Sequence, residues 1–204
     1  MTVTAIVMSD KSKYKIFLND EFAFVLYKGE LRKYGIEEGI ELSENLYNEI
    51  MNELLTKRAK LRAMNLLKSR DYTEAMLKRK LAEGLYPPTV VDTAIEYVKS
   101  YNYINDSRYT ENYIRLNKDN MSINEMKRKL TQKGIDSEVI AEVVEASYDG
   151  SGDSDELIRK LILKKCPDLN ALDYSAKSKL LAYMYRKGFS PDSVERVIRN
   201  MNVD

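Results

Sequence analysis

The tetrapeptide KRKL stands at residues 78–81 and again, 49 residues later, at residues 127–130. Around each copy, two apolar residues stand four positions apart: Leu77 and Leu81 in the first, Met126 and Leu130 in the second. This spacing predicts an amphipathic helix that buries one face. Nothing in that packing requires the three residues between the apolar positions to be basic. The sequence therefore predicts a duplicated helix whose charges serve something other than its core.

The similarity between the two copies extends well beyond the tetrapeptide. Thr73 aligns with Ser122, and both are suited to cap a helix at its N-terminus. A second apolar face follows in each copy and recurs in a third copy 54 residues further on: Val91, Ala94 and Ile95; Ile140, Val143 and Val144; Val194, Val197 and Ile198. The third copy also has the four-residue spacing, at Leu180 and Met184. In it, Leu181, Ala182 and Tyr183 replace the basic triplet.

Turn chemistry separates the helices of these copies. Gly134 and Gly188 suit the left-handed residue that follows a helix. Asp136-Ser137 and Ser190-Pro191 then suit the start of the next helix. A further helix is expected before each capping residue, at residues 58–69, 106–117 and 153–165, with Asp106 as the cap of the second. Each copy is therefore predicted to contain three helices.

The first 45 residues have a different pattern. Residues 14–18 and 22–27 are rich in aromatic and β-branched residues, and Asn19-Asp20 separates them. This arrangement predicts a hairpin, with residues 4–8 as a strand before it. We therefore expect a mainly α fold, with three tandem three-helix repeats in an elongated array and a small β-rich N-terminal region. The expected segments are residues 1–45, 46–104, 105–149 and 150–204.

Composition excludes several function classes. The chain of 204 residues has no His and a single cysteine, Cys166, so the usual Cys/His zinc sites and His-based catalysis are not expected. It contains no nucleotide-binding loop or catalytic triad motif. We expect no cofactor, no membrane segment and no signal peptide, and hence a cytoplasmic protein that is not an enzyme. Residues 149–153 and Cys166 are interpreted as a solvated joint and an incidental thiol.

The net charge of +1 conceals a strong segregation of charge. Residues 57–80 have a balance of +7, whereas residues 81–156 have a balance of −7. A solvated basic face is one interpretation, and a surface for phosphates or acidic protein is the other. On the second interpretation the candidate binding residues are Arg58, Lys60, Arg62, Lys68, Arg70, Lys78, Arg79, Lys80, Lys127, Arg128, Lys129 and Lys133, with Arg186 and Lys187 secondary.

Tyrosine is the other abundant residue type, with fifteen in the chain. Two groups are prominent: Tyr101, Tyr103, Tyr109 and Tyr113 at the start of the second copy, and Tyr174, Tyr183 and Tyr185 in the third. Such rings can stack on bases, anchor a protein interface or pack between helices. The sequence leaves these three roles open.

The chain resembles the RecX family of bacterial regulatory proteins. The resemblance rests on residues 70–81 (RDYTEAMLKRKL), 103–109 (YINDSRY), 129–136 (KLTQKGID) and 186–190 (RKGFS), and on residues 19–24 and 35–39 of the N-terminal region. The chain departs from the family pattern at Thr73 and Met76, where Ser and Glu are usual. It also departs at Asn105-Asp106, where an acidic pair is usual. Thr can still cap a helix, whereas Met76 removes a charge from the surface.

The resemblance implies a monomeric regulator that binds the RecA recombinase filament on single-stranded DNA and inhibits its ATPase and strand exchange. It also implies DNA binding, to single strands and to double-stranded DNA, and roles in recombination, repair and the SOS response. One alternative is a stand-alone DNA-binding protein, such as a transcriptional regulator that uses one repeat as a helix-turn-helix. A second alternative is a scaffold that binds protein alone.

Overall fold

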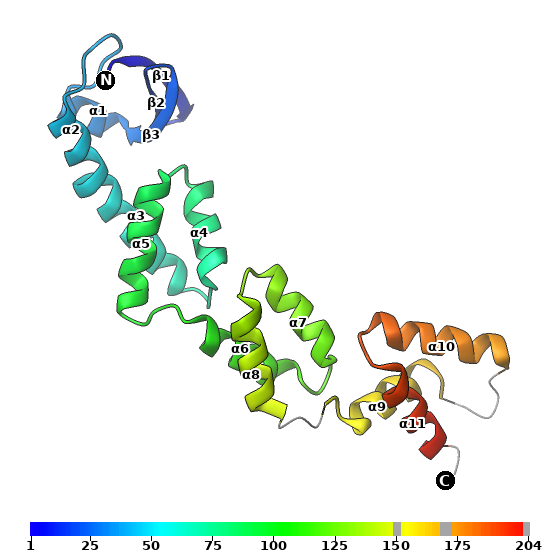
Figure 1. The fold of residues 1–204 in the computed structure, drawn as a ribbon. Coiled ribbons are helices and arrows are strands. Elements are labelled where there is room, and N and C mark those ends of the chain that lie inside the picture. The colour runs from blue at the N-terminus through cyan, green and yellow to red at the C-terminus, as the bar shows by residue number, and fades with distance from the viewer. Residues whose placement is uncertain (149–151, 168–172, 202–204) are drawn as a thin grey trace. The chain divides into compact units, whose positions relative to one another are not determined.

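The computed structural model describes residues 1–148, 152–167 and 173–201 (Figure 1). Residues 149–151 of the predicted joint at 149–153, and with them the expected boundary at residue 149, lie outside the described residues. Within the described residues the fold is mainly α, with a three-stranded antiparallel sheet at the N-terminus, as the sequence predicts. The chain forms two compact units, Met1–Asn105 and Asp106–Asp204. The expected boundaries at residues 45 and 104 stay predictions.

The sheet contains β1 (Val3–Asp10), β2 (Lys13–Leu18) and β3 (Glu21–Tyr27) in that order. The turn between β2 and β3 is the predicted Asn19-Asp20 pair, and both residues have positive φ, 50° and 68°. Asn and Asp tolerate this left-handed conformation better than most residues do. Helix α1 (Lys28–Tyr34), which the sequence pattern did not reveal, follows directly and ends at Gly35 with φ 59°.

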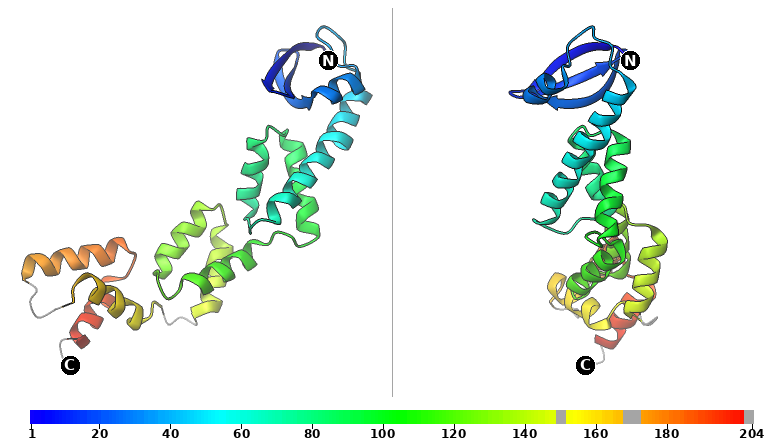
Figure 2. Two further views of the ribbon diagram at one scale, coloured as in Figure 1. Left: turned by 180° about the vertical axis from the view of Figure 1, so that it is seen from behind. Right: turned by 90° about the vertical axis from the view of Figure 1, so that its left-hand side faces the viewer.

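A continuous helical stretch then leads from the sheet into the first three-helix module, as Figure 2 shows from two sides. It consists of α2 (Glu44–Glu49), the π-helical segment η1 (Ile50–Leu55) and α3 (Thr56–Leu67). With α4 (Glu74–Glu83) and α5 (Pro88–Ser100) it completes unit 1. One hydrophobic core runs through the sheet and this module, from Ile16 and Phe24 to Leu77 and Leu81. The β-rich region therefore shares the core of the first repeat, which suits a segment too small to be stable alone.

Unit 2 contains two further modules. The first consists of α6 (Asp106–Asn117), α7 (Ile123–Gln132) and α8 (Ser137–Tyr148), and the second of α9 (Asp155–Lys165), α10 (Tyr174–Arg186) and α11 (Pro191–Met201). Each module has its own core cluster, and these clusters contain the predicted apolar residues. Met126, Leu130 and Met184 have no exposed surface.

The predicted helix caps are confirmed at both ends. The Thr73 hydroxyl accepts a hydrogen bond from the Met76 backbone nitrogen at 3.1 Å, and the Ser122 hydroxyl accepts one from that of Glu125 at 3.0 Å. Gly134 and Gly188 have φ of 80° and 91°. Asp106 differs from expectation, because it is the first residue of α6 and not the residue before it.

Candidate binding surface

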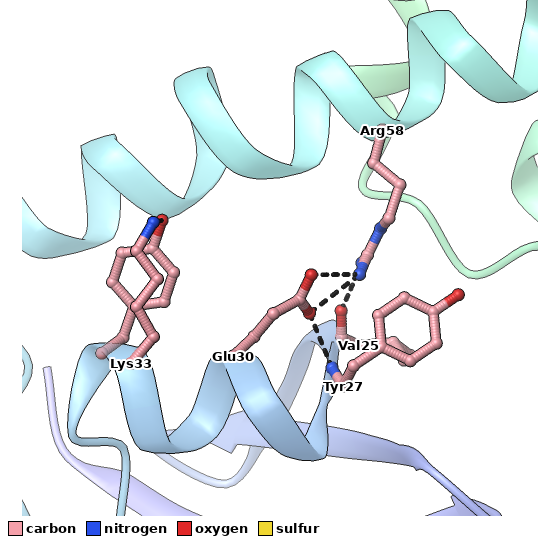
Figure 3. Close-up of polar contacts among 6 residues, drawn as sticks. Val25, Tyr27, Glu30, Lys33 and Arg58 are labelled. Atoms are coloured by element: carbon pink, nitrogen blue, oxygen red, sulfur yellow. Dashed lines mark hydrogen bonds and ion pairs between the residues drawn. The ribbon is translucent and has the colours of Figure 1, made fainter.

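Arg58 has a structural role in unit 1. From α3 its guanidinium donates to the Glu30 carboxylate at 2.9 Å and to the Val25 carbonyl oxygen at 2.6 Å, and it lies 4.8 Å from the centre of the Tyr27 ring (Figure 3). The Tyr27 backbone nitrogen also donates to Glu30, at 2.6 Å. Only about 20% of the Arg58 side chain is exposed. The expectation that Arg58 meets a partner is therefore corrected: it ties the sheet to the first helical module.

Replacing Arg58 with alanine is expected to destabilise unit 1 by about 2 kcal/mol. The substitution leaves the Glu30 carboxylate without its charged donor, and hydrogen bonds to charged groups contribute roughly 1.5–3 kcal/mol. Urea unfolding of the full chain measures the loss. Arg62→Ala on the same helix is the control, expected within about 0.5 kcal/mol of the wild type because Arg62 is exposed. Equal stabilities of the two variants would contradict this role.

The three residues of the first basic triplet differ in their surroundings. Lys78 pairs with Glu74 and with Asp92, each at 3.2 Å, and Lys80 pairs with Glu83 at 2.6 Å. Arg79, between them, is exposed, and no ion pair is found for it within residues 1–148, 152–167 and 173–201. Two of the three charges are thus partly neutralised within the chain, and Arg79 is left as the candidate of this triplet for an external contact.

Glu74 links α4 to α5 by pairing with Lys99 at 3.0 Å as well as with Lys78. Burial acts to raise the pKa of Glu74, but hydrogen bonds from Lys99 and Lys78 outweigh it and hold that pKa below its usual value. Donation to the Glu74 carboxylate in turn raises the pKa of Lys78 and of Lys99. The ionised network therefore favours the folded state.

Replacing Glu74 with glutamine is expected to lower stability by about 0.5–1 kcal/mol at pH 7, as for an exposed network. Because the pKa of Glu74 is lower in the folded than in the unfolded state, its ionisation stabilises the fold above the unfolded-state pKa of about 4.3. This stabilisation is lost as the pH falls through the folded-state pKa. The cost of the substitution should therefore be smaller at pH 3 than at pH 7. Urea unfolding at both pH values checks this, with Glu96→Gln as the exposed control. A cost that is the same at both pH values would contradict the network.

The second basic triplet has a similar division. Lys129 pairs with Glu125 at 3.1 Å, whereas no ion pair is found for Lys127 or Arg128 in the described part of the chain. Arg128 is exposed and aligns with Arg79. The two middle arginines of the repeated tetrapeptides are thus in equivalent settings.

Lys129 and the predicted Lys187 converge on one carboxylate. Glu125 is buried, and the Lys187 ammonium lies 3.8 Å from its second oxygen. Here the start of α7 contacts the turn between α10 and α11, because the Ser122 hydroxyl donates to the Lys187 carbonyl oxygen at 2.6 Å and the Asn124 amide donates to that of Gly188 at 2.8 Å. The ion pair of Lys187 and the hydrogen bonds of Ser122 and Asn124 therefore join the two modules of unit 2, whereas the pair of Lys129 lies within α7. Sequence reasoning missed this joint, which connects residues more than 60 positions apart.

The remaining predicted residues fall into two groups. Three cations lie over tyrosine rings: Lys60 over Tyr97 at 4.7 Å, Arg70 over Tyr72 at 4.6 Å, and Lys133 over Tyr109 and Tyr113, each at 5.8 Å. The others, Arg62, Lys68 and Arg186, are exposed. No ion pair is found for these three within the described residues.

Arg79 and Arg128 are exposed on their modules, and Arg62, Lys68 and Lys127 are further cations for which the described residues provide no ion pair. Fold and surface together define a tandem three-helix protein that offers cations for binding. Among the residues described, no helix is long and apolar enough to cross a membrane.

Two family models match the chain: the RecX first three-helix domain at residues 59–97 and the RecX third three-helix domain at residues 153–198. The chain is thus similar to the RecX family, both in these two modules and in relatives that align over nearly its whole length. A regulatory protein RecX of Caldanaerobacter subterraneus is 28% identical, and the alignment covers 97% of this chain and 98% of that protein. A regulatory protein RecX of Clostridium beijerinckii is 27% identical, and the alignment covers 98% of this chain and 95% of that protein.

Solved structures share the fold. A crystal structure of a regulatory protein RecX superposes with a TM-score of 0.66 at 24% identity and covers 96% of this chain and 98% of the other. The crystal structure of RecX from Lactobacillus salivarius superposes with a TM-score of 0.63 at 21% identity and covers 74% of this chain and 98% of the other. These likenesses confirm the architecture expected from the three sequence copies.

Proposed function

We propose that this chain is a cytoplasmic regulator that binds the RecA recombinase filament on single-stranded DNA and inhibits its ATPase and strand exchange. It acts by stoichiometric binding and not by catalysis, in the setting of recombinational repair and the SOS response. The names of its relatives support a regulatory role. The observation that carries the proposal is the pair Arg79 and Arg128, which are exposed at matched positions with no ion pair inside the described chain.

These arginines are suited to such a partner. A guanidinium binds phosphate or carboxylate oxygens through two parallel hydrogen bonds, and either group is available on a protein filament that coats DNA. An arginine that has no internal carboxylate partner can bind an external anion without first breaking an ion pair. The buried leucine and methionine faces hold both helices in place whether or not a partner is present.

Titration of the chain into a DNA-stimulated RecA ATPase assay tests the proposal. We expect inhibition that saturates at a fixed ratio of this chain to RecA. An unchanged ATPase at excess chain would contradict it. Binding of the chain alone to one duplex sequence in preference to others, without an effect on RecA, would instead identify a transcriptional regulator.

A further inference from the structure

Three tyrosine rings form a row on the surface of unit 1. The ring centres of Tyr97 and Tyr101 are 5.1 Å apart, and those of Tyr101 and Tyr103 are 5.8 Å apart with an angle of only 18° between the ring planes. Tyr101 is 59% exposed and Tyr103 is 50% exposed. Two stacked aromatic rings with this much exposed surface are not explained by the core of the module.

The backbone fixes this row. Tyr97 and Tyr101 are four residues apart at the end of α5, where they share one side of the helix. Asn102 then has a left-handed φ of 54°, and the Tyr103 backbone nitrogen donates to the Val98 carbonyl oxygen at 2.9 Å. Ile104 is buried immediately afterwards, which anchors the turn. The rings are therefore presented in a defined arrangement before any partner arrives.

A pocket of about 270 Å³ adjoins the row. Its lining is Met64, Leu67, Lys68 and Tyr103, so it combines two apolar side chains, an aromatic ring and an ammonium group. No ion pair is found for Lys68 within the described residues. A second cation, Lys60, lies over the Tyr97 ring at the other end of the row. Cations thus flank both ends of an exposed aromatic surface.

We propose that the Tyr103 ring and this pocket bind an unpaired base of single-stranded nucleic acid, with Lys68 contacting the adjacent phosphate. An apolar side chain of a protein would use the pocket but not the ammonium group beside it, whereas a nucleotide has both a flat ring and an anion. Base stacking on tyrosine is a common mode of single-strand binding, and it tolerates any sequence. The inference deepens the proposed function and rests on it, because the RecA filament proposed as the partner contains single-stranded DNA.

The test uses the full chain without RecA and two labelled probes of 20 positions, one of deoxythymidine and one of abasic sites. Fluorescence anisotropy at low salt gives the affinities. We expect the wild type to prefer the thymidine probe and Tyr103→Leu to weaken binding of that probe about 5- to 150-fold, the range for one lost stacking contact. Tyr103→Phe should bind as the wild type does. Lys68→Ala should lower the slope of log affinity against log salt by about 0.7.

Two controls accompany these variants. Tyr174→Leu, at a 91% exposed ring in unit 2, should leave the affinity unchanged. Tyr101→Leu is a second variant of the row that keeps the test valid if Tyr103→Leu does not fold. Thermal unfolding verifies the fold of each.

Three results would overturn the inference. The first is that the folded Tyr103→Leu and Tyr101→Leu variants bind the thymidine probe as tightly as the wild type does. The second is an equal loss of affinity for the thymidine and abasic probes, which would mean that the ring does not contact a base. The third is unchanged DNA binding with weaker ATPase inhibition, which would assign the pocket to a protein side chain. If the wild type binds neither probe but still inhibits RecA, the DNA part of the proposed function fails as well.

Discussion

Replacing both Arg79 and Arg128 with glutamate is expected to raise the concentration needed for half-inhibition of the RecA ATPase about 100-fold. Each charge-assisted hydrogen bond that is lost costs roughly 1.5 kcal/mol or more, which is about tenfold in affinity for each arginine. The fold should be unaffected, because both side chains are exposed and neither forms an ion pair in the described part of the chain. Far-UV circular dichroism and thermal unfolding verify this.

Lys11→Glu/Lys28→Glu is the matched control for that double variant. It changes the net charge by the same amount at two exposed residues in the N-terminal region, outside the helical repeats. Its half-inhibition concentration should stay within about threefold of the wild type, because neither lysine is among the candidate binding residues and an isolated surface charge is largely screened. If the folded Arg79→Glu/Arg128→Glu variant inhibits the RecA ATPase as strongly as the wild type does, these two arginines do not take part in inhibition.

Replacing Gly188 with alanine is expected to destabilise unit 2 by about 3 kcal/mol. Gly188 has φ of 91°, where an L-residue is strained by roughly 1–2 kcal/mol. An added Cβ would also lie 2.7 Å from the Ser122 hydroxyl oxygen and 3.1 Å from the Asn124 Cβ. It would therefore disturb the hydrogen bonds that join the start of α7 to this turn, at about 1 kcal/mol for each bond lost.

Gly152→Ala separates the two contributions. Gly152 has a similar φ of 74°, but a Cβ there meets no heavy atom of the described residues within 4 Å. This variant should lose only the cost of the left-handed backbone, about 1–2 kcal/mol. Urea unfolding combined with hydrogen exchange of unit 2 measures both variants. If Gly188→Ala costs no more than Gly152→Ala, the contact between the two modules of unit 2 does not contribute to stability.

Local features of the fold were predictable from the sequence because they depend on residues close together in the chain. The four-residue spacing of Leu77 and Leu81 places both on one helix face, and a hydroxyl at Thr73 caps the helix through its own backbone. Asn19-Asp20 likewise forms a turn by itself. Repetition at intervals of 49 and 54 residues then gave the number of modules.

The surroundings of the charged residues were not predictable in the same way. Arg58 binds Glu30, 28 residues earlier, and Lys187 lies beside Glu125, 62 residues earlier; such pairs form only when separate elements pack together. The sequence alone gave no reason to distinguish among the basic residues of the two KRKL copies. The structure distinguishes Arg79 and Arg128 from lysines that pair with nearby carboxylates. Tyr97 was missed because its place in the row depends on ring contact with Tyr101 and on Lys60 from another helix.

The salt dependence of binding to a RecA filament on single-stranded DNA tests the central claim most directly, because it counts the ionic contacts formed by the exposed arginines. Affinity is measured at several salt concentrations for the wild type and for Arg79→Gln/Arg128→Gln. We predict a shallower log–log slope for the variant, by about 1.4 if each arginine meets a phosphate of the single strand. Identical slopes and affinities for the two proteins would contradict the claim.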